Sequence, residues 1–180
     1  MRRIADGDRG AFRVLYERYY RRLFHFIYRI TGQVELTEEA LNDAMLVVWR
    51  SAGSFGGRSR VSTWVLGIAY RRALKIKEKS NIRADRFILD ERLANEPVGR
   101  EQEPINEAIL QEWLEAGLRH LSPEQRAVVE LTYYHGYSYQ EIATIVGCPT
   151  NTVKTRMFHA RANLRKWLPF LEAGRPKRTE

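Results

Sequence analysis

Large apolar residues recur at three- and four-residue steps through most of this chain, which is the spacing of an amphipathic helix. We find no strand-like alternation of useful length, no heptad array and no internal repeat. The pattern therefore predicts an all-α protein. It is clearest in the run Phe12, Leu15, Tyr16, Tyr19, Leu23, Phe26, Ile27 and Ile30.

The first part of the chain carries start and stop signals for three helices. Asp8 is expected to cap the first helix and Gly32 to end it. Thr37 is the expected N-cap of the second helix, which runs to about Ala52, and Ser62 is the expected cap of the third. Three amphipathic helices with short connections predict a small bundle.

The last part of the chain has the features of a helix-turn-helix. Ser122-Pro-Glu-Gln and Ser138-Tyr-Gln-Glu are two capping boxes, each opening a short helix. Gly147-Cys-Pro-Thr then makes a turn, and the helix that follows has basic residues outside its apolar stripe. Such a helix fits the DNA major groove. The alternative is a solvated basic face on an ordinary bundle helix.

An acidic stretch separates the two parts. It contains few bulky apolar residues and surrounds two prolines and a glycine, which is typical of an extended linker. We predict a first domain at residues 1–77, a flexible linker at 78–104, a second domain at 105–172 and a basic tail at 173–180. The acids of the stretch are Asp85, Asp90, Glu91, Glu96, Glu101 and Glu103.

The charge balance favours a polyanionic partner. Lys and Arg number 30 against 22 Asp and Glu, a net charge of +8. Aromatic and basic residues are interleaved from Phe55 to Lys75, and single-stranded nucleic acid is bound by this combination because bases stack on aromatic faces. Phe55, in a glycine-rich loop, is the better candidate for base contact, since the spacing of Trp64 equally suits core packing.

Several classes of protein are disfavoured. The single cysteine, Cys148, makes a reducing cytoplasmic compartment the simplest expectation. The apolar runs are far shorter than the roughly 20 residues that span a bilayer, so no membrane insertion is expected. The four histidines are scattered, and no cofactor, metal site or enzymatic activity is expected.

Several motifs, in order along nearly the whole chain, resemble regions 2 and 4 of bacterial RNA polymerase sigma factors. Asp8-Arg-Gly-Ala-Phe-Arg-Val-Leu-Tyr, Thr37-Glu-Glu-Ala-Leu-Asn-Asp-Ala-Met and Ser62-Thr-Trp-Val-Leu-Gly-Ile-Ala are similar to region 2. Tyr137-Ser-Tyr-Gln-Glu-Ile-Ala and Gly147-Cys-Pro-Thr-Asn-Thr-Val-Lys are similar to region 4. The presence of these two regions alone is the arrangement of the extracytoplasmic-function (ECF) group.

The resemblance implies partners and site residues. The partners are core RNA polymerase, through its β′ clamp and β flap, promoter DNA, and an inhibitory anti-sigma factor. The polymerase-binding residues would be Glu38, Glu39, Asn42 and Asp43. The residues that melt and hold the −10 promoter element would be Phe55, Arg58, Arg60, Ser62, Thr63, Trp64, Arg71 and Arg72. Those that read the −35 element would be Asn151, Thr152, Lys154, Thr155, Arg156, His159 and Arg161.

Some positions depart from the family pattern, and other classes of protein stay open. Asn42 stands where the family usually has glutamine, and Arg71 where it usually has asparagine. Cys148 is expected to be a small buried residue, with a redox sensor as the alternative. The runner-up function is a conventional helix-turn-helix regulator that binds DNA without polymerase. A third class is a protein that sequesters a partner without touching DNA.

Overall fold

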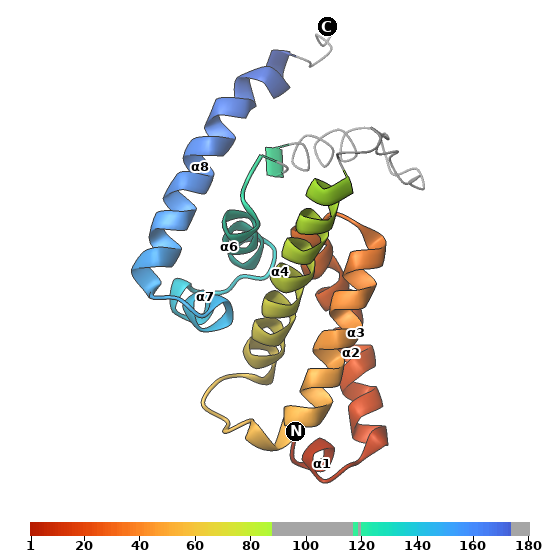
Figure 1. The fold of residues 1–180 in the computed structure, drawn as a ribbon. Coiled ribbons are helices and arrows are strands. Elements are labelled where there is room, and N and C mark those ends of the chain that lie inside the picture. Colours follow the sequence, from red (N-terminus) through yellow and green to blue (C-terminus); the bar gives the residue numbers. More distant parts are fainter. Residues whose placement is uncertain (88–116, 119, 174–180) are drawn as a thin grey trace, which may run out of the picture.

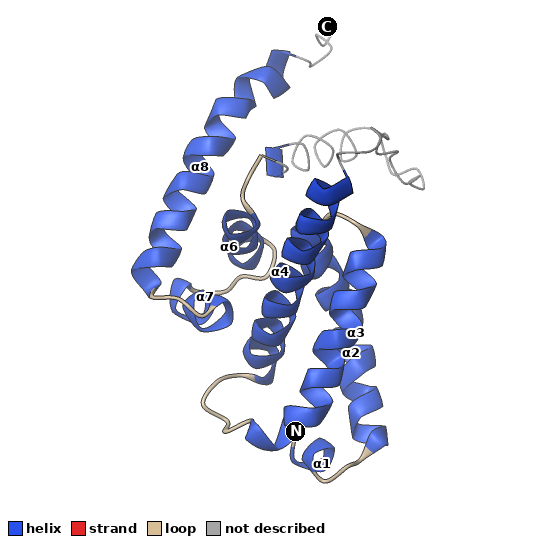
Figure 2. Ribbon diagram, viewed as in Figure 1, coloured by secondary structure: helices blue, strands red, loops and turns tan. Residues whose placement is uncertain are grey.

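The computed structural model describes residues 1–87, 117–118 and 120–173. These residues form helices joined by short connections, and no strand occurs among them (Figure 2). The expected all-α class is confirmed. Figure 1 shows the order of the elements: α1 (Arg2–Ala5), α2 (Arg9–Thr31), α3 (Val34–Ser51), the 3-10 turn η1 (Ala52–Ser54), α4 (Val61–Phe87), α6 (Pro123–Tyr133), α7 (Tyr139–Val146) and α8 (Thr150–Ala173).

Helix α2 has the ends that the sequence predicts. The Asp8 side chain accepts a hydrogen bond from the Ala11 backbone N–H, which satisfies one of the unpaired donors of the first turn. Gly32 ends the helix in the left-handed conformation, at φ 74°, a backbone region that residues with a Cβ rarely adopt. Both signals act locally, so the sequence alone reveals them.

Helix α3 starts earlier than expected, and Thr37 is not its N-cap. The helix begins at Val34, after Gln33, and Thr37 lies fully buried within it. The Thr37 hydroxyl donates to the Gln33 carbonyl at 2.7 Å, the bond that threonine makes from inside a helix. It also lies 2.8 Å from the hydroxyl of Thr31 at the end of α2. Thr37 therefore joins two helices.

Helix α4 differs from expectation at both ends. It begins at Val61, which makes Ser62 its second residue rather than its cap. The Trp64 backbone N–H already donates to the Arg60 carbonyl, so the helical bonding starts from Arg60. The helix continues to Phe87, and residues 78–87, expected to be extended, are helical. The start of the predicted second domain, residues 105–116, lies outside the described residues.

The two capping boxes of the C-terminal part are confirmed. Ser122 and Ser138 each accept from the third residue of their helix, and Gln125 and Glu141 each accept from the cap's own backbone N–H. Gly147 ends α7 at φ 69°, which gives the turn before α8. The caps set where α6 and α7 begin, and Gly147 sets where α7 ends.

The two parts of the chain pack against each other. Helix α4 contacts α3 and α2 on one side and α7 on another, while α2 also contacts α6 (Figure 1). The two parts lie close together at Gly67 of α4, where an added Cβ would lie 3.2 Å from the Ile145 carbonyl oxygen of α7. Because Gly67 has no side chain, the backbones of α4 and α7 can lie this close.

Candidate nucleic-acid interface

The expected polymerase-binding residues form one exposed face of α3. Glu38, Glu39, Asn42 and Asp43 are all exposed, while Ala40, Leu41, Ala44 and Met45 between and beside them are buried. The spacing places the four on adjoining turns of a single helix. The structure thus brings them together as a compact surface with three carboxylates.

The loop before α4 and the start of α4 bring together part of the expected −10 surface. The rings of Phe55 and Trp64 lie 5.4 Å apart, and both side chains are half-buried. Arg58 and Arg60 extend from the same loop and are exposed. An aromatic pair beside two arginines offers a stacking surface and positive charge in one place, as single-stranded nucleic acid requires.

The remaining expected −10 residues lie along α4 in different environments. Arg71 is exposed, and Ser62 and Arg72 are half-buried. Thr63 is only 3% exposed. It lines a cleft of about 520 Å³ that the residues of α7 close from the other side, including Gln140 and Glu141. Thr63 therefore faces the second half of the chain in this arrangement rather than solvent.

The −35 residues occupy the first half of α8. Asn151, Lys154, Thr155, His159 and Arg161 are exposed, whereas Thr152 and Arg156 are half-buried. Their helix is held by the buried stripe of Val153, Met157 and Ala160. Exposed polar and basic side chains opposite an apolar stripe are what groove binding requires of a recognition helix.

Two arginines of this set already have partners within the chain. Arg161 donates to the Tyr133 hydroxyl at 2.8 Å. Arg156 donates to the Cys148 sulfur at 3.8 Å, and it also lies beside Tyr70 of α4, where it opposes the rise that burial gives the pKa of Tyr70, to about 12. Cys148 is a half-buried free thiol that contacts the apolar core.

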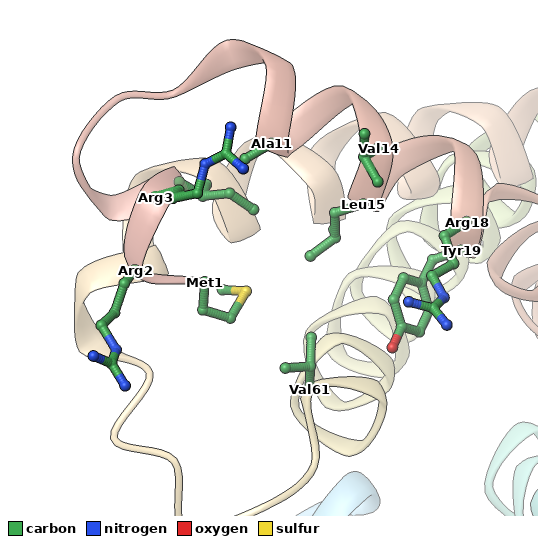
Figure 3. A pocket seen from close by; sticks show the side chains of 10 residues that line it. Met1, Arg2, Arg3, Ala11, Val14, Leu15, Arg18, Tyr19 and Val61 are labelled. Carbon is green, nitrogen blue, oxygen red and sulfur yellow. The ribbon is translucent and has the colours of Figure 1, made fainter.

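A shallow groove of about 460 Å³ lies at the base of the loop, between α1, α2 and the start of α4 (Figure 3). In Figure 3 the side chains of Met1, Leu15 and Val61 lie around the groove, which Arg2, Arg3 and Arg18 also line. The base of the loop thus rests on an incompletely filled edge of the N-terminal core.

Charged and aromatic residues outside the predicted sites join the two halves. Arg22 of α2 donates to His135 Nδ1 at 3.1 Å and lies over the ring of Tyr137, 5.3 Å from its centre. Arg126 donates to the Arg29 carbonyl at 2.8 Å. Since these partners are about a hundred residues apart in sequence, no local pattern could have indicated them.

Two titratable residues at this contact are strongly affected by burial. Burial raises the pKa of Glu130 to about 7, and Arg29, whose Nε lies 3.9 Å from its carboxylate, opposes the rise. Burial also lowers the pKa of His135 to about 4, with Arg22 and His25 adding to the fall. Both groups therefore favour their uncharged forms in this arrangement.

Two absences apply to the described residues only. None of the groupings of His, Cys, Asp and Glu in residues 1–87 and 120–173 is arranged to hold a metal ion. Within those same ranges no helix has the length and apolar character needed to cross a membrane.

Comparisons with known proteins identify both halves. Residues 15–81 match the family model for sigma-70 region 2, and residues 111–164 match the model for sigma-70 region 4. The chain is 34% identical over 169 residues to the ECF RNA polymerase sigma factor SigM of Mycobacterium tuberculosis, covering 93% of this chain and 82% of that protein. It is 26% identical to the RNA polymerase sigma-H factor of Pseudomonas aeruginosa, covering 92% and 90% of the two chains.

Solved structures show the same fold. The sigma factor RpoE of Bartonella quintana, in complex with the anti-sigma factor NepR, superposes with a TM-score of 0.69 at 23% identity, covering 88% of this chain and 97% of that one. CnrH, in complex with the cytosolic domain of CnrY, gives a TM-score of 0.66 at 20% identity, with 93% of each chain covered.

The two halves thus contain regions 2 and 4 of a sigma-70-type transcription initiation factor, in that order along the chain. Within that class, the chain belongs to the ECF RNA polymerase sigma factors.

Proposed function

We propose that this protein binds core RNA polymerase and directs it to specific promoters, with no catalytic activity of its own. The observation that carries the proposal is the order of two matched regions, the first with an exposed acidic face beside an aromatic and arginine-rich loop, the second with an exposed basic recognition helix. The polymerase performs the chemistry, and this chain contributes binding surfaces. Its place of action is the cytoplasm.

Each surface has a separate task in the proposal. The α3 face of Glu38, Glu39, Asn42 and Asp43 binds the β′ clamp, and the region 4 half meets the β flap. The loop around Phe55 and the start of α4 hold the unpaired −10 strand, because aromatic rings stack on bases. The exposed side of α8 enters the −35 major groove. The domain limits of 1–77 and 105–172 remain proposals.

An anti-sigma factor is the proposed inhibitor. Support comes from a solved structure of the same fold, in which the sigma factor RpoE is in complex with the anti-sigma factor NepR. An inhibitor that covers either DNA-binding surface would keep the factor from promoters.

Addition of the protein to core polymerase tests the function directly. Promoter-dependent transcripts are expected with the wild-type chain and not with core enzyme alone. A chain that binds promoter duplex tightly and sequence-specifically without core enzyme would contradict the proposal and favour a conventional regulator.

The assignment of separate surfaces to the −35 and −10 elements has its own test. Arg161→Ala should weaken binding of the −35 duplex by about 1 to 3 kcal/mol if the guanidinium contacts a base. On a template that is already melted, the open complex should still form. Arg165→Ala is the matched control, since Arg165 is exposed on the same helix but outside the expected set.

Phe55→Ala should leave duplex recognition nearly unchanged and reduce open complexes, because it removes a stacking surface worth about 1 to 3 kcal/mol per base. Phe55→Tyr keeps an aromatic face and should restore opening. Permanganate footprinting of unpaired thymines distinguishes these outcomes. Normal opening by Phe55→Ala would remove the loop from the −10 site.

A further inference from the structure

The side chains of Tyr133 and Arg161 meet at the surface between α6 and α8. Tyr133 is the last residue of α6, and Arg161 lies near the middle of α8, which packs beside α6 (Figure 1). Nη2 of Arg161 donates to the Tyr133 hydroxyl at 2.8 Å. Tyr133 is 60% exposed, and Arg161 is exposed as well. A ligand in solution can therefore reach both side chains.

The hydrogen bond leaves donors free on both residues. The Tyr133 hydroxyl accepts from Arg161, so its own proton is still available to an acceptor. Arg161 uses only one of the N–H groups of its guanidinium in this bond. Within the described residues, neither side chain makes a further hydrogen bond or an ion pair. Donors of two kinds thus remain together at one exposed place, without an acceptor from the described part of the chain.

The charge at this place is positive. The partner of Arg161 is a neutral phenol, whereas Arg13, for example, is ion-paired with Glu17. Lys154 is also exposed and precedes Arg161 by seven residues, which is about two helical turns, so both cations lie along the same edge of α8. An edge with these properties favours an anionic ligand that accepts hydrogen bonds.

The position of Arg161 on α8 favours the DNA backbone over the bases. Arg161 lies four residues after the buried Met157 and three before Leu164, which packs against the core. Residues at these spacings are neighbours on a helix, so Arg161 stands at the edge of the buried stripe. Thr155 is exposed and lies two residues after the buried Val153, on the opposite side of α8. When such a helix enters a major groove, the middle of its exposed face meets the base edges, and its margins meet the phosphates that line the groove.

We propose that the Tyr133 hydroxyl and the Arg161 guanidinium together form a binding site for one backbone phosphate of duplex DNA beside the −35 element. Arg161 supplies the charge and further N–H donors. Tyr133 fixes the direction of the guanidinium and donates its own proton to the same phosphate. The site positions α8 in the groove and reads no base. Its location at the −35 element rests on the proposed function, although phosphate binding itself needs no promoter.

Salt dependence separates a phosphate contact from a base contact. A short fluorescent duplex of random sequence is titrated with the full chain at several salt concentrations. Each phosphate that a cation neutralises contributes about 0.9 to the slope of log affinity against log salt concentration. Arg161→Ala should therefore reduce the magnitude of this slope by about 0.9, whereas Arg161→Lys keeps the charge and should leave the slope unchanged.

Tyr133→Phe removes only the hydroxyl. The phenol is uncharged, so the slope should keep its wild-type value while the affinity falls about tenfold, as expected for one hydrogen bond to a charged group. In the Arg161→Ala background the same substitution should change the affinity by less than about twofold, because the hydroxyl is then no longer held beside a bound phosphate. Tyr134→Phe is the matched control. Tyr134 is the next residue, its ring lies beside Arg29 of α2, and the affinity should not change.

The polymerase complex shows where the site acts. Core polymerase with the wild-type chain is used to select promoter duplexes from a randomised library, and the variants are then compared on the selected sequence. Arg161→Ala should weaken binding of this duplex and of its single-base variants in the −35 element by the same factor. Circular dichroism checks that each variant keeps the helical content of the wild type.

Four results would overturn the proposal. They are an unchanged salt slope for Arg161→Ala, an unchanged affinity for Tyr133→Phe, equal effects of Tyr133→Phe with and without Arg161, and a loss for Arg161→Ala that depends on one −35 base pair. The last result would make Arg161 a base contact. If the polymerase complex selects no sequence while Arg161→Ala still reduces the slope on the random duplex, the proposed function is refuted and the phosphate site is supported.

Discussion

Glu130→Gln is expected to stabilise the protein at alkaline pH, although it removes a partner of Arg29. Glu130 is 3% exposed, and burial raises its pKa from 4.5 to about 7. The folded state therefore binds more protons than the unfolded state between these values. Stability from this group is fully present below pH 4.5 and is lost as the pH rises to about 7. Glutamine keeps the shape of the side chain and does not titrate.

The size of the effect follows from the two pKa values. At about 1.4 kcal/mol per unit, a shift from 4.5 to about 7 corresponds to about 3 kcal/mol in the free energy of unfolding. Roughly 1 kcal/mol of this is already lost at pH 5, because the unfolded carboxyl has begun to ionise there. The stability difference between variant and wild type should thus grow by about 2 kcal/mol from pH 5 to pH 8.

Urea unfolding followed by circular dichroism at both pH values measures this difference. His135 acts in the opposite direction, since its lowered pKa of about 4 makes stability fall as the pH drops below 6.5. Both proteins contain His135, so its contribution cancels when they are compared. Glu124→Gln, on the same helix but half-exposed, is the control for replacing a glutamate that is not buried. A Glu130→Gln variant that is less stable than wild type at pH 8 would show that the ion pair with Arg29 outweighs burial.

Three further substitutions have expected outcomes. Ser138→Ala removes the α7 capping box and should lower the free energy of unfolding by about 1 kcal/mol, which calorimetry measures. Polymerase binding, followed by gel filtration, should not change. Thr37→Val removes the hydroxyl that lies against that of Thr31 and should reduce the free energy of unfolding by about 1 to 3 kcal/mol in urea titrations. An unchanged free energy of unfolding would mean that the contact between these two buried hydroxyls does not stabilise the protein. Glu39→Lys with Asp43→Lys should abolish co-purification with core polymerase while helical content stays the same, and a folded double variant that still binds would remove α3 from the polymerase contact.

Local signals predicted the parts of the fold that depend on neighbouring residues. The caps at Asp8, Ser122 and Ser138 act within one helical turn, and each is confirmed. Thr37 and Ser62 were assigned as caps by the same rule, which proved wrong because a hydroxyl inside a helix can bond to the carbonyl four residues back or simply continue the helix. The rule identifies residues that can cap and does not show that they do.

The contact between the halves was beyond sequence reasoning for a different reason. Arg22 and His135 are 113 positions apart, and their pairing follows from how whole helices pack. Two signals were nevertheless present. Glu130 interrupts the apolar run between Val129 and Leu131, which suggests a buried charge with a function, and Gly67 lies in the interior of α4, where glycine disfavours a helix unless another backbone comes close.

Only some of the expected DNA-binding residues lie together in the structure. Phe55, Trp64 and the loop arginines lie together, but Thr63 faces α7 and Arg156 lies beside α4. Motif resemblance indicates which side chains meet DNA in the working complex. It contains no information about which of them a free chain keeps covered, since that depends on the partner-free packing of the two halves.

The glycine of α4 that lies against the backbone of α7 has a genetic consequence. No side chain larger than a hydrogen atom fits at position 67 without a tight contact to the Ile145 carbonyl, while most replacements suit the helix itself better than glycine does. Missense changes at this codon should therefore all act in the same direction, against the packing of α4 on α7.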